Sequence, residues 1–169
     1  DCREPLDEFI RQVTHLREKL DVFLLQLPPK LAFDRRQVDE FLKLFRARTA
    51  VHIACEPRHV SWFTEPAADL LRRHNICRVA ADPAITELAA LPGAWGGIEY
   101  WRLHGSPVIY RSSYANNIGT IAKRLTQGTS PEHGAWCVFD NTASSAATAD
   151  ALALQRAIFA GKSYLTSMR

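Results

Sequence analysis

The sequence predicts an α/β fold in which parallel strands alternate with helices. Short apolar runs of strand-forming residues alternate along the 169-residue chain with longer segments whose apolar residues recur at helical spacing. The apolar runs end abruptly in polar or charged residues, which is typical of strands that reach the binding face of a parallel sheet. Successive strand–helix–strand units of this kind are joined by right-handed crossovers.

Helices are expected from their apolar spacing and their caps. Residues 5–19 carry an apolar stripe at positions i, i+3, i+4 and i+7. Asp34 and Thr64 can each cap a helix, and Pro66 suits the first turn of the helix that follows Thr64. The expected helices lie at 5–19, from 34 to 45, from 64 past Leu71, at 116–125 and at 144–159.

Five strands are expected between these helices, at 22–27, 49–56, 77–82, 99–104 and 135–140. The Pro- and Gly-containing stretches at 91–97 and 128–134 are expected loops. A closed parallel barrel has eight strands. The sequence therefore predicts either an open sheet or a barrel whose N-terminal part is absent from this chain.

The composition narrows the class of protein. The chain is 47% hydrophobic and 23% charged, and its net charge is +3, which suits a globular domain. Basic residues are accompanied by acids, so nucleic-acid binding is disfavoured. We expect neither a membrane segment nor a signal peptide. Three of the four cysteines lie in expected strands and none forms a C-x-x-C pair, which favours reduced thiols and a cytoplasmic location.

The strongest functional signal is AVHIACEPRHVSWF, residues 50–63. The apolar run ends at an acid, Glu56, and the loop that follows presents two bases, Arg58 and His59, and an indole, Trp62. This profile is typical of a buried strand that delivers polar side chains to a site. Core packing is the alternative interpretation for Trp62.

A second polar pair lies in the fourth expected strand. Arg102 and His104 are two residues apart and therefore share one face. Burying them is costly unless acids pair with them, and a structural ion pair is the alternative for any one residue. Because the carboxyl ends of parallel strands meet at one edge, we expect a single site there. Its predicted members are Gln26, Glu56, Arg58, His59, Trp62, Asp82, Arg102, His104, Asp140 and Asn141.

Four motifs along the chain resemble those of the YecE-like family, also called domain of unknown function 72, and they occur in the family's order. They are QLPP at 26–29, E-x-R-H-x-S-W at 56–62, RLHG at 102–105 and F-D-N at 139–141. The resemblance implies a TIM-type β/α barrel, incomplete here, with residues 1–169 forming a single partial barrel domain that lacks the first three strands. Family members usually carry two asparagines after the last phenylalanine, whereas this chain has Asp140 and Asn141. The family's activity is not established, so the resemblance implies a fold and a site only.

These residues favour an enzyme that acts on a small anionic substrate, phosphorylated or sugar-like, with acid–base hydrolysis as the leading reaction. Arg58 and Arg102 would hold the anion. Glu56 would be the general base or a metal ligand, and His104, or less favourably His59, would be the general acid. The other predicted members would bind substrate, namely Gln26, Trp62, Asp82, Asp140 and Asn141. For Asp82 and Asp140 the alternative is that they orient the histidine or bind a hard cation.

Cofactors and other functions stay open at this level. A divalent metal is compatible with these side chains, although no motif requires one. One alternative is a non-catalytic module that binds a ligand or a nucleic-acid end. Another is an inactive, truncated barrel whose exposed sheet edges promote self-association.

Overall fold

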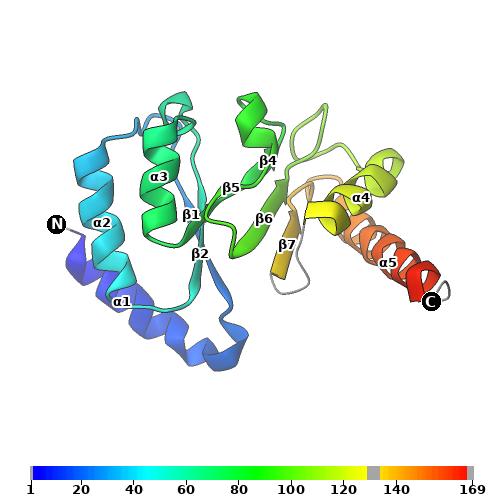
Figure 1. Ribbon diagram of the computed structural model, residues 1–169. Helices are drawn as coiled ribbons and strands as arrows, with labels where there is room; N and C mark the ends of the chain where they lie inside the picture. Colours follow the sequence, from blue (N-terminus) through cyan, green and yellow to red (C-terminus); the bar gives the residue numbers. More distant parts are fainter. Residues whose placement is uncertain (1, 129–133, 167–169) are drawn as a thin grey trace.

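The computed structural model of the chain describes residues 2–128 and 134–166. These residues form two sheets that are parallel apart from one short strand (Figure 1). The first sheet contains, in spatial order, β1 (Val22–Gln26), β2 (His52–Glu56), β3 (Ile76–Arg78) and β5 (Gly93–Ala94). The second contains β4 (Ala80–Asp82), β6 (Ile98–Leu103) and β7 (Gly134–Phe139). Only β5 runs antiparallel to its neighbour, β3.

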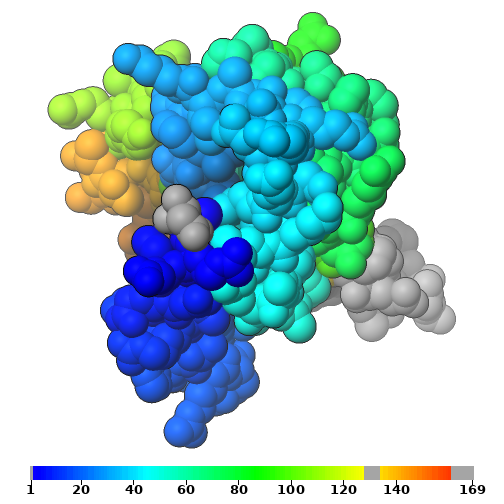
Figure 2. Space-filling view, turned by 90° about the vertical axis from the view of Figure 1, so that its left-hand side faces the viewer, coloured from blue at the N-terminus to red at the C-terminus, as the bar shows by residue number. Residues whose placement is uncertain are grey.

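The helices flank the outer sides of the two sheets. In Figure 1, α1 (Arg3–Val13), α2 (Arg35–Arg46) and α3 (Glu65–Arg73) lie on the side of β1–β3, and α4 (Ile118–Gly128) and α5 (Ala146–Thr166) lie on the side of β7. Figure 2 shows α1 (blue) and α2 (cyan) next to each other on one face of the molecule. Arg48, which follows α2, forms an ion pair with Asp7 of α1. The mixed α/β class predicted from the sequence is confirmed.

Local signals placed several helix starts correctly. The Asp34 carboxylate accepts a hydrogen bond from the Gln37 N–H at 2.9 Å, which caps α2 as predicted. Thr64 stands at the cap position of α3, but its side chain makes no capping hydrogen bond. The first helix is shorter than predicted, because the chain continues from Thr14 to Lys19 as a 3₁₀ segment in which Arg17 has a φ of +52°.

One expected strand was wrong in detail. The run at 77–82 is divided at Val79 into β3 and β4, which pair with different neighbours, β2 and β6. Val79 still donates its N–H to the Cys55 carbonyl at 2.8 Å. The strand thus passes from one sheet to the other, and this shift links the two sheets.

The expected loops and the barrel also differ from the structure. The stretch at 91–97 contains β5, and most of the stretch at 128–134 lies outside the described residues. Within the described ranges the two sheets do not close into the barrel that the resemblance implies. The outer edges of β1 and β7 have no neighbouring strand in this part of the chain.

Each sheet has its own apolar core against its helices. Leu42 and Phe45 of α2 pack with Ile53 of β2 and with Leu70 and Leu71 of α3. A second core joins the outer face of β6 to α4 and α5 through Trp101, Leu103, Ile118, Leu125 and Leu154. Among the described helices, none combines the length and the apolar character needed to cross a membrane.

Candidate functional site

Glu56 lies at the centre of a buried group of charged side chains. It is the last residue of β2 and stands opposite Gln26, the last residue of β1. The residue is only 2% exposed. Its Oε1 accepts hydrogen bonds from Arg58 Nε at 3.1 Å and from His104 Nε2 at 3.2 Å. Its Oε2 accepts one from Arg102 Nη1 at 2.6 Å, so a single carboxylate holds three basic side chains.

Arg102 connects the ends of three strands. Its Nη1 also donates to Gln26 Oε1 at 2.6 Å, and its Nη2 pairs with the carboxylate of Asp140, which follows β7. The alternation of side chains along β6 puts Arg102 on the face opposite Trp101 and Leu103. The predicted site at the carboxyl ends of β1, β2, β6 and β7 therefore holds a charge network in which every carboxylate has a guanidinium partner.

His104 completes this network, and Glu56 determines which of its nitrogens carries hydrogen. The ionised Glu56 can only accept, so Nε2 of His104 is the donor in their contact. The other nitrogen, Nδ1, lies 3.3 Å from Asp140 Oδ2 but makes no hydrogen bond among the described residues. Nδ1 is thus buried, and the Asp140 carboxylate is the polar group beside it.

The surroundings strongly favour the ionised form of Glu56. Burial by itself would raise its pKa, but hydrogen bonds from His104 and Arg102, together with the positive charges of Arg102 and Arg58, more than offset this. The pKa of Glu56 falls from 4.5 to about 2. A carboxylate whose ionised form is stabilised to this degree is a weak base. The geometry therefore supports a role for Glu56 in positioning its neighbours more than in proton abstraction.

A cavity of about 210 Å³ opens beside this network. The polar end of the cavity is formed by Glu56, Arg58 and His104. Of the three basic side chains that contact Glu56, that of Arg58 is the most accessible, with 27% of its surface exposed. The remaining wall is apolar, with Phe63, Val79, Pro83, Ala84, Ile85 and Ile109 among its residues. The cavity therefore offers charged groups, among them the partly exposed guanidinium of Arg58, at one end and mostly apolar surface elsewhere.

The loop after β6 supplies part of this wall. Gly105 has a φ of +98°, and an added Cβ would come within 3.0 Å of the Val108 carbonyl, so glycine is required for the turn. The turn brings Tyr110 to the cavity, where its ring meets the His104 ring edge-to-face with 6.0 Å between centroids. The sequence places Tyr110 in a loop after the fourth expected strand and leaves open whether this loop covers the site or is an exposed turn, because nothing local shows that it folds back over the strand end.

Two predicted site residues lie away from the network. His59 caps a short 3₁₀ turn (Val60–Trp62), where its Nδ1 accepts from the Ser61 N–H at 3.2 Å. Trp62 is 2% exposed, donates from Nε1 to the Leu31 carbonyl at 2.9 Å and packs against Phe33. Its placement matches the core-packing alternative, because the 3₁₀ turn directs the indole beneath β1 and β2.

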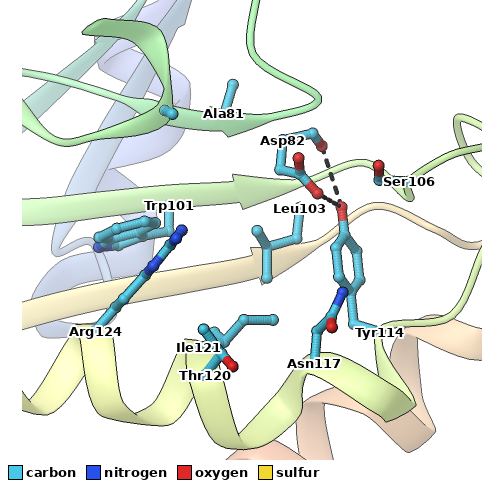
Figure 3. A pocket seen from close by; sticks show the side chains of 11 residues that line it. Ala81, Asp82, Trp101, Leu103, Ser106, Tyr114, Asn117, Thr120, Ile121 and Arg124 are labelled. Atoms are coloured by element: carbon cyan, nitrogen blue, oxygen red, sulfur yellow. Dashed lines mark hydrogen bonds between the residues drawn. The ribbon is translucent and has the colours of Figure 1, made fainter. Parts of the chain in front are cut away.

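Asp82 and Asn141 also make other contacts than those of the network. Asp82 accepts a hydrogen bond from the Tyr114 hydroxyl at 2.7 Å and borders a second cavity (Figure 3). Asn141 is fully buried and donates to Asp150 Oδ2 at 2.6 Å and to the Ser112 carbonyl at 3.0 Å. Asp150, on α5, also accepts from the Tyr114 N–H, so Asn141 helps to anchor the loop rather than to meet Glu56.

For Tyr114, in the loop after the fourth expected strand, the sequence leaves open whether its phenol reaches the site or lies in an exposed turn, and no local pattern marks Asp150. Both hold the loop after β6 in place through contacts that span more than thirty residues, as between Asp150 and Tyr114, with |i−j| = 36. Among the described residues, no group of three or more His, Cys, Asp or Glu side chains could hold a metal ion. The cysteines Cys55, Cys77 and Cys137 lie in β2, β3 and β7 and are unpaired thiols.

Comparison with known proteins places this site in a family. The family model described as "Protein of unknown function DUF72" matches residues 1–167. The chain belongs to the DUF72 family. This is the YecE-like family under another name, so the resemblance seen in the four motifs is confirmed. No curated protein matches the chain.

Solved structures of DUF72 family proteins share the fold. A member from Thermotoga maritima has 24% identity and a TM-score of 0.72 over 92% of this chain and 65% of its own. A member from Enterococcus faecalis has 16% identity and a TM-score of 0.75 over 94% of this chain and 66% of its own. The chain thus spans about two thirds of the length of these DUF72 proteins.

Proposed function

We propose that the network around Glu56 and the adjoining cavity bind a small anionic molecule and act on it by acid–base hydrolysis. The observation that carries this proposal is the convergence of Arg58, Arg102 and His104 on one buried carboxylate at the carboxyl ends of the strands. Ligands of α/β proteins bind beyond these ends. We also propose that the complete family domain is a TIM-type barrel and that this hydrolysis is the activity of the whole protein.

Arg58 binds the anion in this proposal. Its guanidinium borders the cavity and is partly exposed, whereas Arg102 is occupied by Gln26, Glu56 and Asp140. A guanidinium forms strong, charge-assisted hydrogen bonds with carboxylate or phosphate oxygens. Arg102 then acts indirectly, because it holds Glu56 and Asp140 in place.

His104 transfers the proton. Glu56 fixes the hydrogen on Nε2, and the other nitrogen, Nδ1, is buried beside Asp140. In this proposal the proton of the attacking water therefore reaches Nδ1 through the Asp140 carboxylate and returns to the leaving group by the same route. Asp140 lies beside Nδ1 and is 24% exposed, so it can relay the proton to solvent. In this scheme Glu56 is a positioning residue, and the general-base role predicted from the sequence passes to His104.

The cavity wall narrows the class of ligand. Most of its lining is apolar, and the polar groups lie together at one end. A sugar would leave its hydroxyl groups unpaired against Phe63, Ile85 and Ile109, which is unfavourable. We therefore assign to this cavity an anionic head on an apolar body, such as an aromatic phosphate monoester.

Binding of phenyl phosphate, measured by isothermal titration calorimetry at pH 7, tests the proposal. Arg58→Gln should weaken binding about tenfold, since loss of one charge-assisted contact costs about 1.5 kcal/mol. Arg73→Gln is the matched control, because this exposed arginine on α3 lies outside the cavity lining. Equal affinity of the two variants would contradict the proposed site.

Turnover separates an enzyme from a binding module that uses the same cavity. Release of 4-nitrophenol from 4-nitrophenyl phosphate should be detectable and should be lost in His104→Gln. Binding without product release would favour the non-catalytic alternative, for which the low pKa of Glu56 is the supporting observation. Self-association through the outer edges of β1 and β7 and the cytoplasmic location stay predictions.

A further inference from the structure

A second cavity, of about 310 Å³, lies on the other face of β6 (Figure 3). Trp101 and Leu103 point into it, whereas Arg102 and His104 face the network around Glu56. Of the residues that line the two cavities, only Ala81 is common to both. The volume of this second cavity falls at the lower end of the roughly 300–1,000 Å³ that is typical of ligand pockets.

The cavity exists because the connection from β4 to β6 contains no α-helix. Parallel strands are usually joined by an α-helix that covers the sheet. Here the connection holds only a 3₁₀ turn (Glu87–Ala90) and β5. The outer face of β6 is therefore covered by α4 on one side and left hollow beside Trp101.

One end of the cavity is rich in hydrogen-bonding groups. The Tyr114 hydroxyl, which accepts the Gly105 N–H at 2.9 Å, donates to Oδ2 of Asp82 and holds that carboxylate in place. Oδ1 of Asp82 has no hydrogen-bond partner among the described residues. Ser106, Asn117 and Thr120 also line this region, and each can donate and accept.

The other end carries a positive charge. Figure 3 shows Arg124 rising from α4 on the Trp101 side of the cavity, away from Asp82 and Tyr114. Its guanidinium forms no hydrogen bond or ion pair within the described part of the chain. Arg124 lies about two helical turns past Asn117, which ends the 3₁₀ turn before α4 (Ala115–Asn117), so the charge and the polar groups lie at different ends of the cavity.

We propose that this cavity is a second binding site, specific for a phosphorylated monosaccharide. The sugar hydroxyls bind Asp82 and the polar side chains near it, the apolar face of the ring packs on Trp101 and Leu103, and the phosphate binds Arg124. An apolar acid would leave the polar end unpaired, and a free sugar would leave Arg124 unpaired. The ligand class thus differs from that of the cavity beside Glu56, whose wall is apolar.

The test uses glucose 6-phosphate, glucose and inorganic phosphate as probes in isothermal titration calorimetry with the whole chain. Glucose 6-phosphate should bind at least tenfold more tightly than either of the other two. Arg124→Gln should weaken this binding about tenfold. Arg156→Gln, an exposed arginine on α5 outside the cavity lining, should leave it unchanged.

Two outcomes overturn the proposal. Inorganic phosphate binding as tightly as glucose 6-phosphate would reduce the site to a single exposed arginine. Loss of sugar-phosphate binding in Arg58→Gln with full binding in Arg124→Gln would place the ligand in the cavity beside Glu56. Because Arg58 and Arg124 line different cavities, the experiments can confirm or reject each of the two proposed sites independently of the other.

Discussion

Replacing Glu56 with glutamine should destabilise the fold strongly and in a pH-dependent way. The substitution keeps the shape of the side chain but removes the charge that Arg58, Arg102 and His104 share. Arg102 is then left buried with Asp140 as its remaining charged partner. Removing one member of a buried ion pair typically costs about 3–5 kcal/mol, because the other charge loses its compensation.

The pKa of Glu56 gives a second measure of this cost. The value falls from 4.5 in a free side chain to about 2 in the fold. This difference corresponds to about 3 kcal/mol, at roughly 1.36 kcal/mol per pH unit. Since the pKa is lower in the folded state, the stabilisation is complete above about pH 5 and is lost as the pH falls toward 2. About 2 kcal/mol should already be lost at pH 3.

Urea unfolding followed by tryptophan fluorescence at pH 7 and pH 3 measures this effect. At pH 7 the free energy of unfolding of Glu56→Gln should lie about 3 kcal/mol below that of the unsubstituted chain. The gap should shrink to about 1 kcal/mol at pH 3. Glu65→Gln is the control, because this side chain is 74% exposed and its ion pair should contribute less than about 1 kcal/mol. Equal stability at pH 7, or a gap that persists at pH 3, would refute the reasoning.

Two further predictions concern the second cavity and the thiols. Tyr114→Phe should lower the free energy of unfolding by about 1–3 kcal/mol, because the buried Gly105 N–H loses its acceptor; an unchanged urea midpoint would argue against this. At pH 8 a chromogenic disulfide reagent should label only the exposed Cys2 rapidly in the folded chain, and all four cysteines in urea. Burial raises the pKa of Cys77 and Cys137 to about 12 and raises that of Cys55 as well, so rapid labelling of a second thiol would contradict the buried placement of Cys55 and Cys77 and the half-buried placement of Cys137.

Local patterns predicted much of the fold because they depend on neighbouring residues alone. The apolar spacing and Asp34 located α2, and the apolar runs located β1, β2, β6 and β7 within a few residues. The break at Val79 was missed, because each half of the run has an acceptable strand sequence. Only the pairing partners, β2 for one half and β6 for the other, divide it.

The same distinction applies to the site. Alternation along β2 and β6 showed that Glu56, Arg102 and His104 share a face, and their meeting follows from the parallel register. Asn141 follows Asp140 directly, yet it contacts Asp150 on α5 instead of the network. Both residues lie beyond the end of β7, where strand alternation no longer applies, and only their contacts show that Asp140 belongs to the site and Asn141 to its support.

The sequence by itself determined the α/β class, the family and the face on which the charged residues gather, since each is encoded in local spacing and short motifs. The tertiary structure alone decided which charges meet, that Trp62 is part of the core, and that a second cavity opens beside Trp101. The physical reason is distance along the chain. Contacts such as Arg102 with Glu56, with |i−j| = 46, depend on strand register and crossover length, which no local pattern specifies.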